Sequence, residues 1–295
     1  MRVVVLFKIV PELNDLAEED WSADASSGRL SPVERYARTV FNPEDESALE
    51  LALRLRDAWR AGASSGGAPS GPAEVSLRAV TLSESLARRR LETLGALGFD
   101  EVVSLSPPGP ETDPRFSPET TSRLLAAEIP LEGPTLVLTG CRSADGCNGL
   151  TPMLLAERLG WPLVTEVLSV APAPPPDKAG RSPDKTPGLS VESLSDDGLV
   201  RQLVSPPIVL AVGSAPVPCL RAPTLRDRLK AGGGPVRQKN APVDLDGRRT
   251  DAAPRVSYVL KNLLRETKSR PTTVVSGGSA LEKAAVVLAR LRERG

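Results

Sequence analysis

Histidine is absent from this sequence of 295 residues, and its absence excludes several kinds of catalysis. Without imidazole there is no Ser-His or Cys-His nucleophile pair, no histidine acid or base, and no histidine-ligated metal. Aromatic side chains are also scarce, at 3% of the residues, whereas 29 residues are proline. This composition predicts a core of Ala, Leu and Val joined by long irregular connections.

A net charge, long apolar runs and cysteine pairs are lacking too. The 37 basic residues balance 37 acidic ones, which disfavours nucleic acid or an anionic membrane as a partner. No apolar run approaches the roughly 18 residues that span a bilayer, so no membrane insertion is expected. The three cysteines, Cys141, Cys147 and Cys219, form neither an even disulfide set nor a CxxC pair, and the start MRVVVLFKIV lacks a signal-peptide pattern. These features predict a folded protein of the cytoplasm.

Apolar runs alternate with helical patterns over most of the chain. Strands are expected at residues 3–10, 75–82, 102–105, 136–138, 163–170 and 208–212. Helices are expected after Asn42, from Ser83 to Gly98, at 117–129, at 153–159, and near the end with Leu281, Ala284, Leu288 and Leu291 on one face. The alternation predicts an α/β fold, a doubly wound and mostly parallel sheet with helices on both faces. Two short runs around Asp196-Asp197-Gly198 predict a β-hairpin extension of this sheet.

The connections divide the chain. Residues 11–40 are polar and predict a long excursion with a small hairpin, and residues 61–72 are rich in Gly, Ser and Pro and predict a flexible connection. Residues 171–188 form a Pro-rich, disorder-prone insertion. We expect one α/β domain over residues 1–230 and a C-terminal extension with a terminal helix over residues 231–295.

The helix after Asn42 has clear start signals. Asn42 can cap it, Pro43 suits its first position, and the acids at residues 44–46 complement the positive end of the helix dipole. Nothing in the sequence indicates a perturbed pKa for these acids. Ala48 and Leu55 fall on one face of the helix, and Glu50 and Asp57 fall on another.

The stretch from Leu136 to Pro162 is the leading candidate for a ligand site. It predicts a buried strand, a small polar loop over residues 140–151 and a helix. In an open α/β sheet, ligands bind where loops leave the carboxyl ends of strands, because N–H groups and the helix dipole favour an anion there. A plain connecting turn is the alternative, at about even odds on topology alone. For Cys141 and Cys147, inert filling is favoured over a redox role by roughly nine to one.

Several short motifs stand in a fixed order along the chain. They are Phe7-Lys8 at the end of the first strand, Asn42-Pro43 with acids before ALELALRL, LGFDE at residues 97–101, LVLTG at 136–140, an Asp-Gly loop, and AERLGWP at 156–162. A charged hairpin then leads to SPPIV at 205–209. Together, over about residues 2–230, these motifs resemble the beta subunit of electron transfer flavoproteins.

The resemblance implies a subunit that carries electrons rather than an enzyme. Family members pair with an alpha subunit that holds most of an FAD, and the heterodimer takes electrons from a dehydrogenase and passes them to a quinone-linked or other acceptor. The beta subunit binds AMP, or in some relatives a second FAD. The C-terminal extension would then pack on the alpha subunit.

The resemblance also implies site residues, which lie at strand ends and helix starts. The nucleotide would contact Lys8, Asn42, Thr81, Leu82, Ser83, Gly140, Ser143, Ala144, Asp145, Gly146, Cys147, Asn148 and Thr151. A recognition loop over about residues 218–230 would present Leu225, preceded by Thr224, to the dehydrogenase. No catalytic residue and no metal ligand are expected.

Two other functions compete with this interpretation. A stand-alone adenine-nucleotide-binding regulatory protein similar to universal stress proteins would have the same fold without an alpha partner. It would need a late glycine-rich phosphate loop, and Gly277-Gly278-Ser279 is too isolated to provide one. A nucleotidyl-transferring or hydrolysing enzyme is disfavoured because the sequence has no P-loop and no histidine.

Overall fold

A computed structural model of the chain shows the arrangement of its elements. It describes residues 1–12, 21–23, 30–32, 38–64, 74–83, 88–107, 114, 117–144, 147–173, 188–214, 219–232, 236–241, 275–276 and 278–292. The chain divides into two units. Unit 1 comprises Met1–Asp20 and Pro32–Arg255, and unit 2 comprises Trp21–Ser31 and Val256–Gly295.

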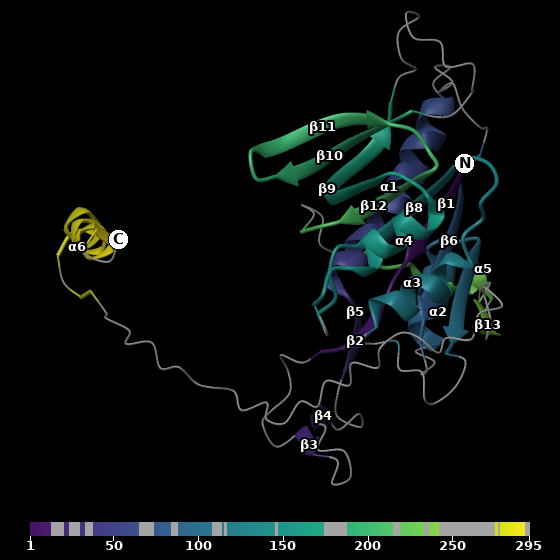
Figure 1. The fold of residues 1–295 in the computed structure, drawn as a ribbon, viewed down its shortest axis with the longest axis horizontal. Helices are drawn as coiled ribbons and strands as arrows, with labels where there is room; N and C mark the ends of the chain where they lie inside the picture. Colours follow the sequence, from purple (N-terminus) through teal and green to yellow (C-terminus); the bar gives the residue numbers. More distant parts are fainter. Residues whose placement is uncertain are drawn as a thin grey trace, which may run out of the picture. The chain divides into compact units, whose positions relative to one another are not determined.

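Unit 1 is built on a sheet of nine strands in the order β11-β10-β9-β12-β8-β1-β6-β7-β13 (Figure 1). The strands are β1 (Arg2–Leu6), β6 (Ser76–Leu82), β7 (Glu101–Ser106), β8 (Thr135–Gly140), β9 (Leu163–Pro172), β10 (Leu189–Ser195), β11 (Gly198–Val204), β12 (Ile208–Val212) and β13 (Val236–Asn240). All pairings are parallel except those of β10 with β9 and with β11. A separate pair, β2 (Ile9–Pro11) and β5 (Thr39–Phe41), is antiparallel.

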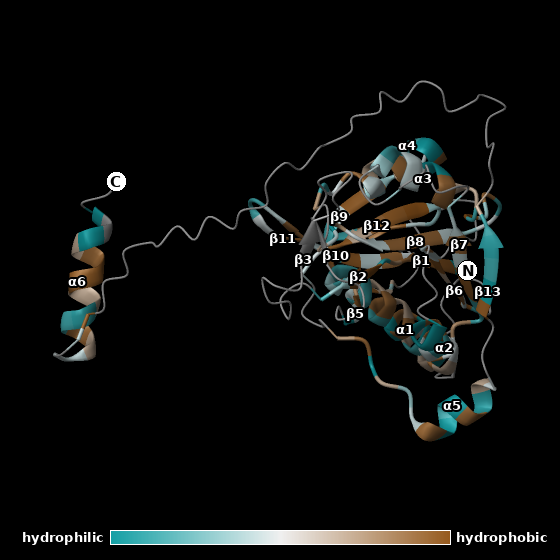
Figure 2. Ribbon diagram, turned by 90° about the horizontal axis from the view of Figure 1, so that it is seen from below, coloured by the Kyte–Doolittle hydropathy of each residue, from teal (hydrophilic) through white to brown (hydrophobic). Residues whose placement is uncertain are grey.

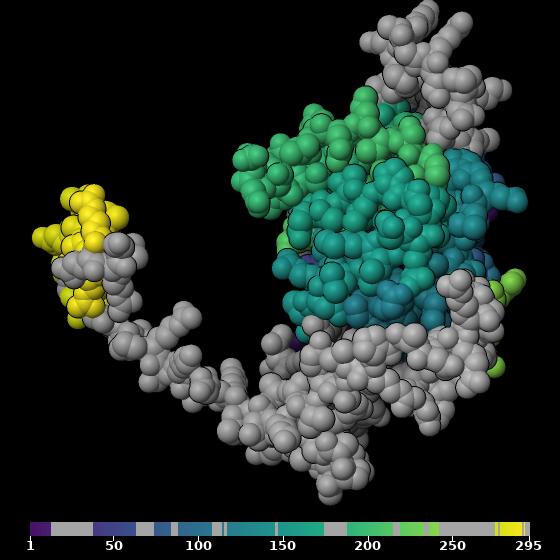
Figure 3. Space-filling model, in the orientation of Figure 1, coloured from purple at the N-terminus to yellow at the C-terminus, as the bar shows by residue number. Residues whose placement is uncertain are grey.

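Helices cover both faces of this sheet. They are α1 (Pro43–Ser64), α2 (Arg88–Ala96), α3 (Pro118–Ala126) and α4 (Thr151–Leu159), whereas the short helix α5 (Leu225–Ala231) packs on α2. Figure 2 shows α3 and α4 on one side of the sheet and α1 and α2 on the other. In the space-filling view, the teal part of the chain that includes α4 covers the face turned to the viewer (Figure 3). The predicted doubly wound, mostly parallel α/β fold is therefore confirmed.

Successive side chains of the central strands point to opposite faces of the sheet, which divides the core into two layers. Val3 and Val5 of β1 pack in the cluster with α1, whereas Val4 and Leu6 pack in the cluster with α3 and α4. All four side chains are at most 2% exposed. Because successive side chains of a strand point to opposite faces, a near-continuous apolar run is needed to fill both layers.

Some elements differ from the prediction. The expected strand over residues 3–10 is two strands, because the chain leaves the main sheet at Phe7 and Lys8 and β2 pairs with β5 instead. The hairpin around residues 196–198 is present as β10 and β11. Helix α5 and strand β13 were not predicted, and β13 extends the sheet beyond residue 230 by pairing with β7. The flexible connection predicted at residues 61–72 begins inside α1, and the insertion predicted at 171–188 begins inside β9. Residues 65–73 and 174–187 lie outside the described residues.

Unit 2 contains β3 (Trp21–Ala23), which pairs with β4 (Leu30–Pro32), and the helix α6 (Ala280–Arg292). The terminal helix was predicted from its amphipathic pattern. Its apolar residues Leu281, Val287 and Leu288 are exposed. Over the described parts of both units, no helix has the length and apolar character needed to cross a membrane.

Candidate functional site

A cavity lies at the carboxyl edge of the sheet, beside the loop between β8 and α4. It encloses about 110 Å³. Three strand ends meet there because β1, β6 and β8 are parallel neighbours in the sheet. They contribute residues 6–8, Leu82 and residues 139–141 to the lining. Helices α3 and α4 complete its wall, with Thr121 of α3 and Thr151 of α4 among the lining residues. The position matches the ligand edge that the topology predicted.

The start of α1 fixes the loop. Nδ2 of Asn42 donates to the carbonyl of Arg142 at 2.8 Å, and Oδ1 of Asn42 accepts from the N–H of Ala144 at 2.9 Å. Glu44 accepts from the N–H of Arg142 at 2.5 Å. Residues 42 and 44 therefore use three hydrogen bonds to hold a loop about 100 positions further along the chain.

Asp45 joins two strand ends from the same helix turn. Its Oδ1 accepts from the N–H of Gly140 at 2.7 Å, and its Oδ2 accepts from the N–H of Lys8 at 2.9 Å. Burial raises the pKa of Asp45 to about 7, although hydrogen bonds from Gly140, Lys8 and Asn42 lower it. The prediction that this residue is an unperturbed helix-dipole acid is therefore wrong. Gly140 is required at this contact, because a Cβ there would lie 2.6 Å from Oδ1 of Asp45.

Two glutamates lie beside Arg142, an exposed residue of the loop. Nε of Arg142 lies 3.7 Å from Glu44, and its Nη2 lies 3.8 Å from Glu166. Burial raises the pKa of Glu44, against the lowering effect of Arg142. Beside them, Cys141 donates to the carbonyl of Ala211 at 3.2 Å, and burial raises the pKa of its thiol to about 12. Cys141 is buried, which favours the predicted filling role, whereas Cys147, for which the same role was predicted, is exposed.

The structure brings together about half of the predicted nucleotide contacts. Those that line the cavity are Lys8, Leu82, Gly140, Ser143, Asn148 and Thr151. Thr81 is buried inside β6 and outside the cavity lining, and no described group hydrogen-bonds to its hydroxyl. Ser83, Asn42, Ala144 and Cys147 are also absent from the lining. Asp145 and Gly146 lie outside the described residues.

Other lining residues were missed by sequence reasoning. Asp45 and Arg142 line the cavity together with α3 residues Pro118, Thr121 and Leu125. Asp45 could have been found from its place one turn into a helix that follows a strand end. The α3 residues carry no sequence signal, because only the packing of α3 against α4 brings them to this edge.

The donor set decides what the cavity can hold. The backbone N–H groups of Gly140, Arg142 and Ala144 are already bonded to side chains of α1, so they do not provide a phosphate cradle. Cationic Lys8 and Arg142 and the hydroxyls of Ser143 and Thr151 also line the space, and these groups fit an anion. The volume is below the roughly 300–1,000 Å³ of small-molecule pockets, so it suits one phosphate or sugar of a nucleotide. Within the described residues, no group of three Cys, Asp or Glu side chains could hold a metal ion.

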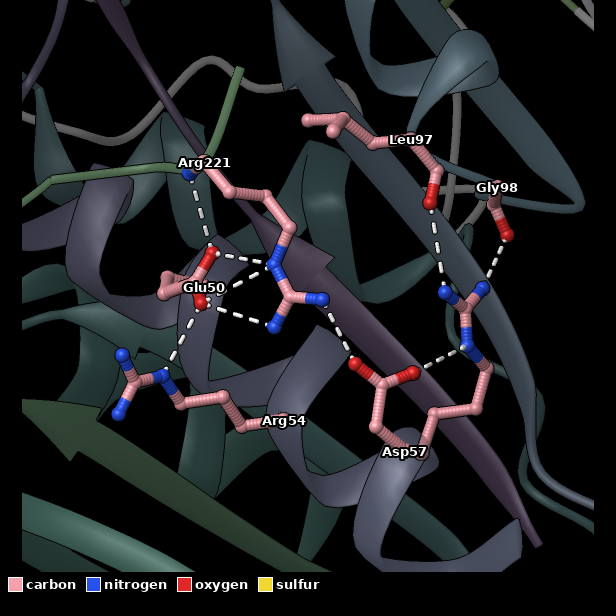
Figure 4. Close-up of polar contacts among 7 residues, drawn as sticks. Glu50, Arg54, Asp57, Leu97, Gly98 and Arg221 are labelled. Atoms are coloured by element: carbon pink, nitrogen blue, oxygen red, sulfur yellow. Dashed lines mark hydrogen bonds and ion pairs between the residues drawn. The ribbon is translucent and has the colours of Figure 1, made fainter. Parts of the chain in front are cut away.

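A second polar network lies on α1, away from the cavity. Arg221 donates from Nε and Nη2 to the carboxylate of Glu50 at 2.9 to 3.1 Å and from Nη1 to Asp57 at 2.6 Å (Figure 4). Glu50 is only 3% exposed and also accepts from Arg54. Glu50 is on the polar face of α1, and the segment before α5 covers it.

This network fixes the segment that leads into α5. The N–H of Arg221 donates to Glu50 at 3.1 Å, and three residues later Thr224 caps α5. Thr224 and Asp227 form a reciprocal capping box. The predicted recognition residue Leu225 is the first residue of α5 and is 74% exposed, as is Leu229 one turn later.

The architecture defines a doubly wound α/β protein with a cavity at the carboxyl edge of its sheet. The family model described as the electron transfer flavoprotein domain matches residues 30–243. YgcR of Escherichia coli strain K12, assigned as an electron transfer flavoprotein subunit, is 31% identical over 287 residues, which cover 96% of this chain and 95% of YgcR.

Other relatives match over a shorter stretch. The electron transfer flavoprotein subunit beta of Mycobacterium tuberculosis strain H37Rv is 27% identical over 173 residues, 58% of each chain. The caffeyl-CoA reductase-Etf complex subunit CarD of Acetobacterium woodii is 29% identical over 171 residues, 57% of this chain and 55% of CarD. The chain belongs to the electron transfer flavoprotein family, in agreement with the predicted resemblance.

Proposed function

We propose that this chain is the beta subunit of a heterodimeric electron transfer flavoprotein. It binds an adenine nucleotide at the carboxyl edge of its sheet and helps an alpha subunit to hold FAD. The heterodimer takes electrons from a dehydrogenase and passes them to a downstream acceptor, and this chain turns over no substrate of its own. The observation that carries the proposal is the cavity beside residues 140–151 in a chain that aligns with YgcR over almost its whole length.

The nucleotide site is assigned to the cavity on the basis of its donors. Lys8 and Arg142 supply positive charge, Ser143 of the loop supplies a hydroxyl donor, and Thr151 supplies another at the start of α4. Residues 42, 44 and 45 hold the backbone at Gly140, Arg142 and Ala144 in place by hydrogen bonds. AMP is the favoured ligand, and a second FAD is the alternative.

The protein groups position the cofactors, and the flavin supplies the redox chemistry when bound. The partner-facing element is α5, where the capping box at Thr224 orients Leu225 toward solvent. An exposed leucine of this kind can insert into a pocket of a dehydrogenase and act as a small binding hot spot. The C-terminal helix α6 is assigned to the contact with the alpha subunit because its apolar residues are exposed.

Co-expression of the full chain with an electron transfer flavoprotein alpha subunit from the same genome tests the proposal. We expect a heterodimer on gel filtration with visible flavin absorbance, because neither subunit alone completes the flavin site. Each chain purified alone is the control. A pair that does not associate, or that associates without flavin, contradicts the proposed function.

Leu225→Ala tests the recognition residue. We expect slower electron transfer from the dehydrogenase donor to the heterodimer, because the variant loses a buried contact worth about 2 kcal/mol in a partner pocket. Flavin content should not change. The matched control is Leu131→Ala, since Leu131 is also an exposed leucine, at 68%, and lies far along the chain from α5. Equal rates for the two variants would remove the recognition role from Leu225.

A further inference from the structure

An open cleft of about 900 Å³ lies between α2 and α5, separate from the nucleotide cavity. The two helices pack against each other, and their side chains line one continuous surface. Arginines dominate it. The lining residues are Thr39, Arg88, Arg89, Arg90, Glu92, Thr93 and Arg228.

The cleft has an excess of positive charge that its own residues do not neutralise. Arg88 pairs with Glu92 at 2.8 Å, and Arg90 donates to the carbonyl of Thr39 while its guanidinium stacks over Phe41. Arg89 of α2 and Arg228 of α5 are exposed, and among the described residues neither has a carboxylate partner. Three of these arginines also lie in the first turn of α2, where the helix dipole is positive and repels cations.

The cleft borders the exposed leucines of α5. Arg228 lies in the same helix turn as Leu225 and Leu229, each of which is 74% exposed. Arg221 fixes the segment that enters α5 through its contacts with Glu50 and Asp57 (Figure 4). The surface therefore presents two apolar anchors and a basic cleft in a fixed arrangement.

We infer that the cleft between α2 and α5 is a docking surface for an acidic segment of a partner protein, with Arg89 and Arg228 as its main contacts. The inference rests on the proposed electron-carrier function, because it names the chemistry of the donor that Leu225 contacts. A partner that fits has carboxylates beside an apolar pocket. Charge complementarity of this kind speeds the encounter and orients the partner without making the complex long-lived.

An acidic protein fits this surface better than other anions do. The two adjacent leucines favour a partner with an apolar pocket, which nucleic acid lacks. The chain as a whole has no net charge, which disfavours nucleic acid or an anionic membrane as the partner.

Binding of a labelled acidic peptide to the full chain tests the inference. The probe contains four glutamates and two leucines, and the control peptide has lysines in place of the glutamates. We expect fluorescence anisotropy to show binding of the acidic peptide only. Binding should weaken as salt rises from about 0.01 to 0.15 M, because the screening length falls from about 30 to 8 Å.

Charge reversal locates the contact. Arg89→Glu and Arg228→Glu should each weaken peptide binding on the order of fivefold, since each removes one attraction and adds one repulsion. Arg201→Glu is the matched control, because Arg201 of β11 is 72% exposed and the change in net charge is the same. We expect it to bind the peptide like the wild type.

Defined outcomes overturn the inference. If Arg89→Glu and Arg228→Glu bind the acidic peptide as tightly as Arg201→Glu does, the cleft is not the site. Tighter binding of a duplex oligonucleotide or of vesicles containing phosphatidylserine would assign the cleft to another class of partner. Self-association that both variants abolish would assign it to a second copy of this chain. The flavin content of the heterodimer is measured separately, so a failed cleft leaves the proposed function standing.

Discussion

Asp45 is a buried carboxyl group that links the ends of β1 and β8 to the first turn of α1. Hydrogen bonds from two N–H groups stabilise its carboxylate form, but burial destabilises that form by more. The pKa of Asp45 therefore rises to about 7. In the unfolded chain the same group ionises near its usual pKa of 3.8. Between these two values the folded protein keeps a proton that the unfolded chain has lost.

The free energy of unfolding therefore carries a contribution from Asp45 that falls as pH rises from about 4 to 7. The loss over that interval is on the order of a few kcal/mol, and the full contribution is present only below the lower pKa. In Asp45→Asn this titration is removed. We expect urea unfolding at pH 4.5 and 7 to show a smaller decrease for the variant than for the wild type. Parallel pH profiles would show that Asp45 is not held in the protonated form.

The three cysteines should differ in reactivity because only a thiolate attacks an alkylating reagent. Burial raises the pKa of Cys141 to about 12, whereas Cys147 and Cys219 are exposed. We expect iodoacetamide at pH 8 to label the two exposed cysteines first. Peptide mass spectrometry measures the rates, and full labelling in urea is the control. Labelling of Cys141 at the rate of the others would contradict the buried position.

The site residues show what sequence could and could not supply. Lys8, Gly140 and Thr151 were predicted from the ends of apolar runs, because parallel strands bring their carboxyl ends to one edge. Asp45 was assigned to the helix dipole because its charge and position fit that role equally well. Its burial depends on residue 140, which lies 95 positions away, and no local pattern contains that contact.

At the scale of elements, α1 forms hydrogen bonds with two distant segments of the chain. Its first turn holds the loop of the cavity, and its middle holds Arg221 in front of α5. The acids of this one helix thus fix two segments that are widely separated in sequence. The polar face predicted for α1 is correct in composition, but Glu50 on it is buried by a segment from the far end of unit 1.

The pairing of Arg221 with Glu50 should stabilise this arrangement. Arg221→Ala leaves a carboxylate that is 3% exposed, with Arg54 and the backbone N–H of residue 221 as its remaining partners. We expect a loss of about 2 kcal/mol in unfolding free energy, below the roughly 3–5 kcal/mol for a fully buried pair because Arg221 is partly exposed. In a double-mutant cycle with Glu50→Gln, the two losses should be less than additive. Additive losses would show that the contact contributes nothing.

Helices and strands whose apolar residues recur with a regular period were predicted from the sequence. Those that depend on contacts with distant parts of the chain were not. Apolar runs in the sequence coincide with the strands β6, β7, β8, β9 and β12, and amphipathic patterns coincide with the helices α1, α3 and α4. Strand β13 reads VRQKN, which is polar because it is an edge strand with only one neighbour. Helix α5 has no buried residue, so no hydrophobic period marks it.

At the scale of the whole molecule, the order of strands places the three strand ends that line the cavity side by side. β8, β1 and β6 are adjacent in the sheet although β8 is the last of them in the chain. The family and the fold were predicted from the sequence. The cleft of arginines was not, because it depends on the packing of α5 against α2, which are far apart in sequence.

The most direct test of the account is the number of nucleotides bound per heterodimer. Wild-type protein should release one AMP and one FAD, or two FAD, on denaturation and mass spectrometry. Gly140→Ala should lose the second nucleotide while keeping the first FAD, because its Cβ would lie 2.6 Å from Asp45 and displace the loop. Gly160→Ala is the control for backbone strain without a clash, since the φ of 64° at Gly160 disfavours Ala but no atom lies within 4 Å of a Cβ there. Full nucleotide content in Gly140→Ala, or no second nucleotide in the wild type, would contradict the assignment of this cavity.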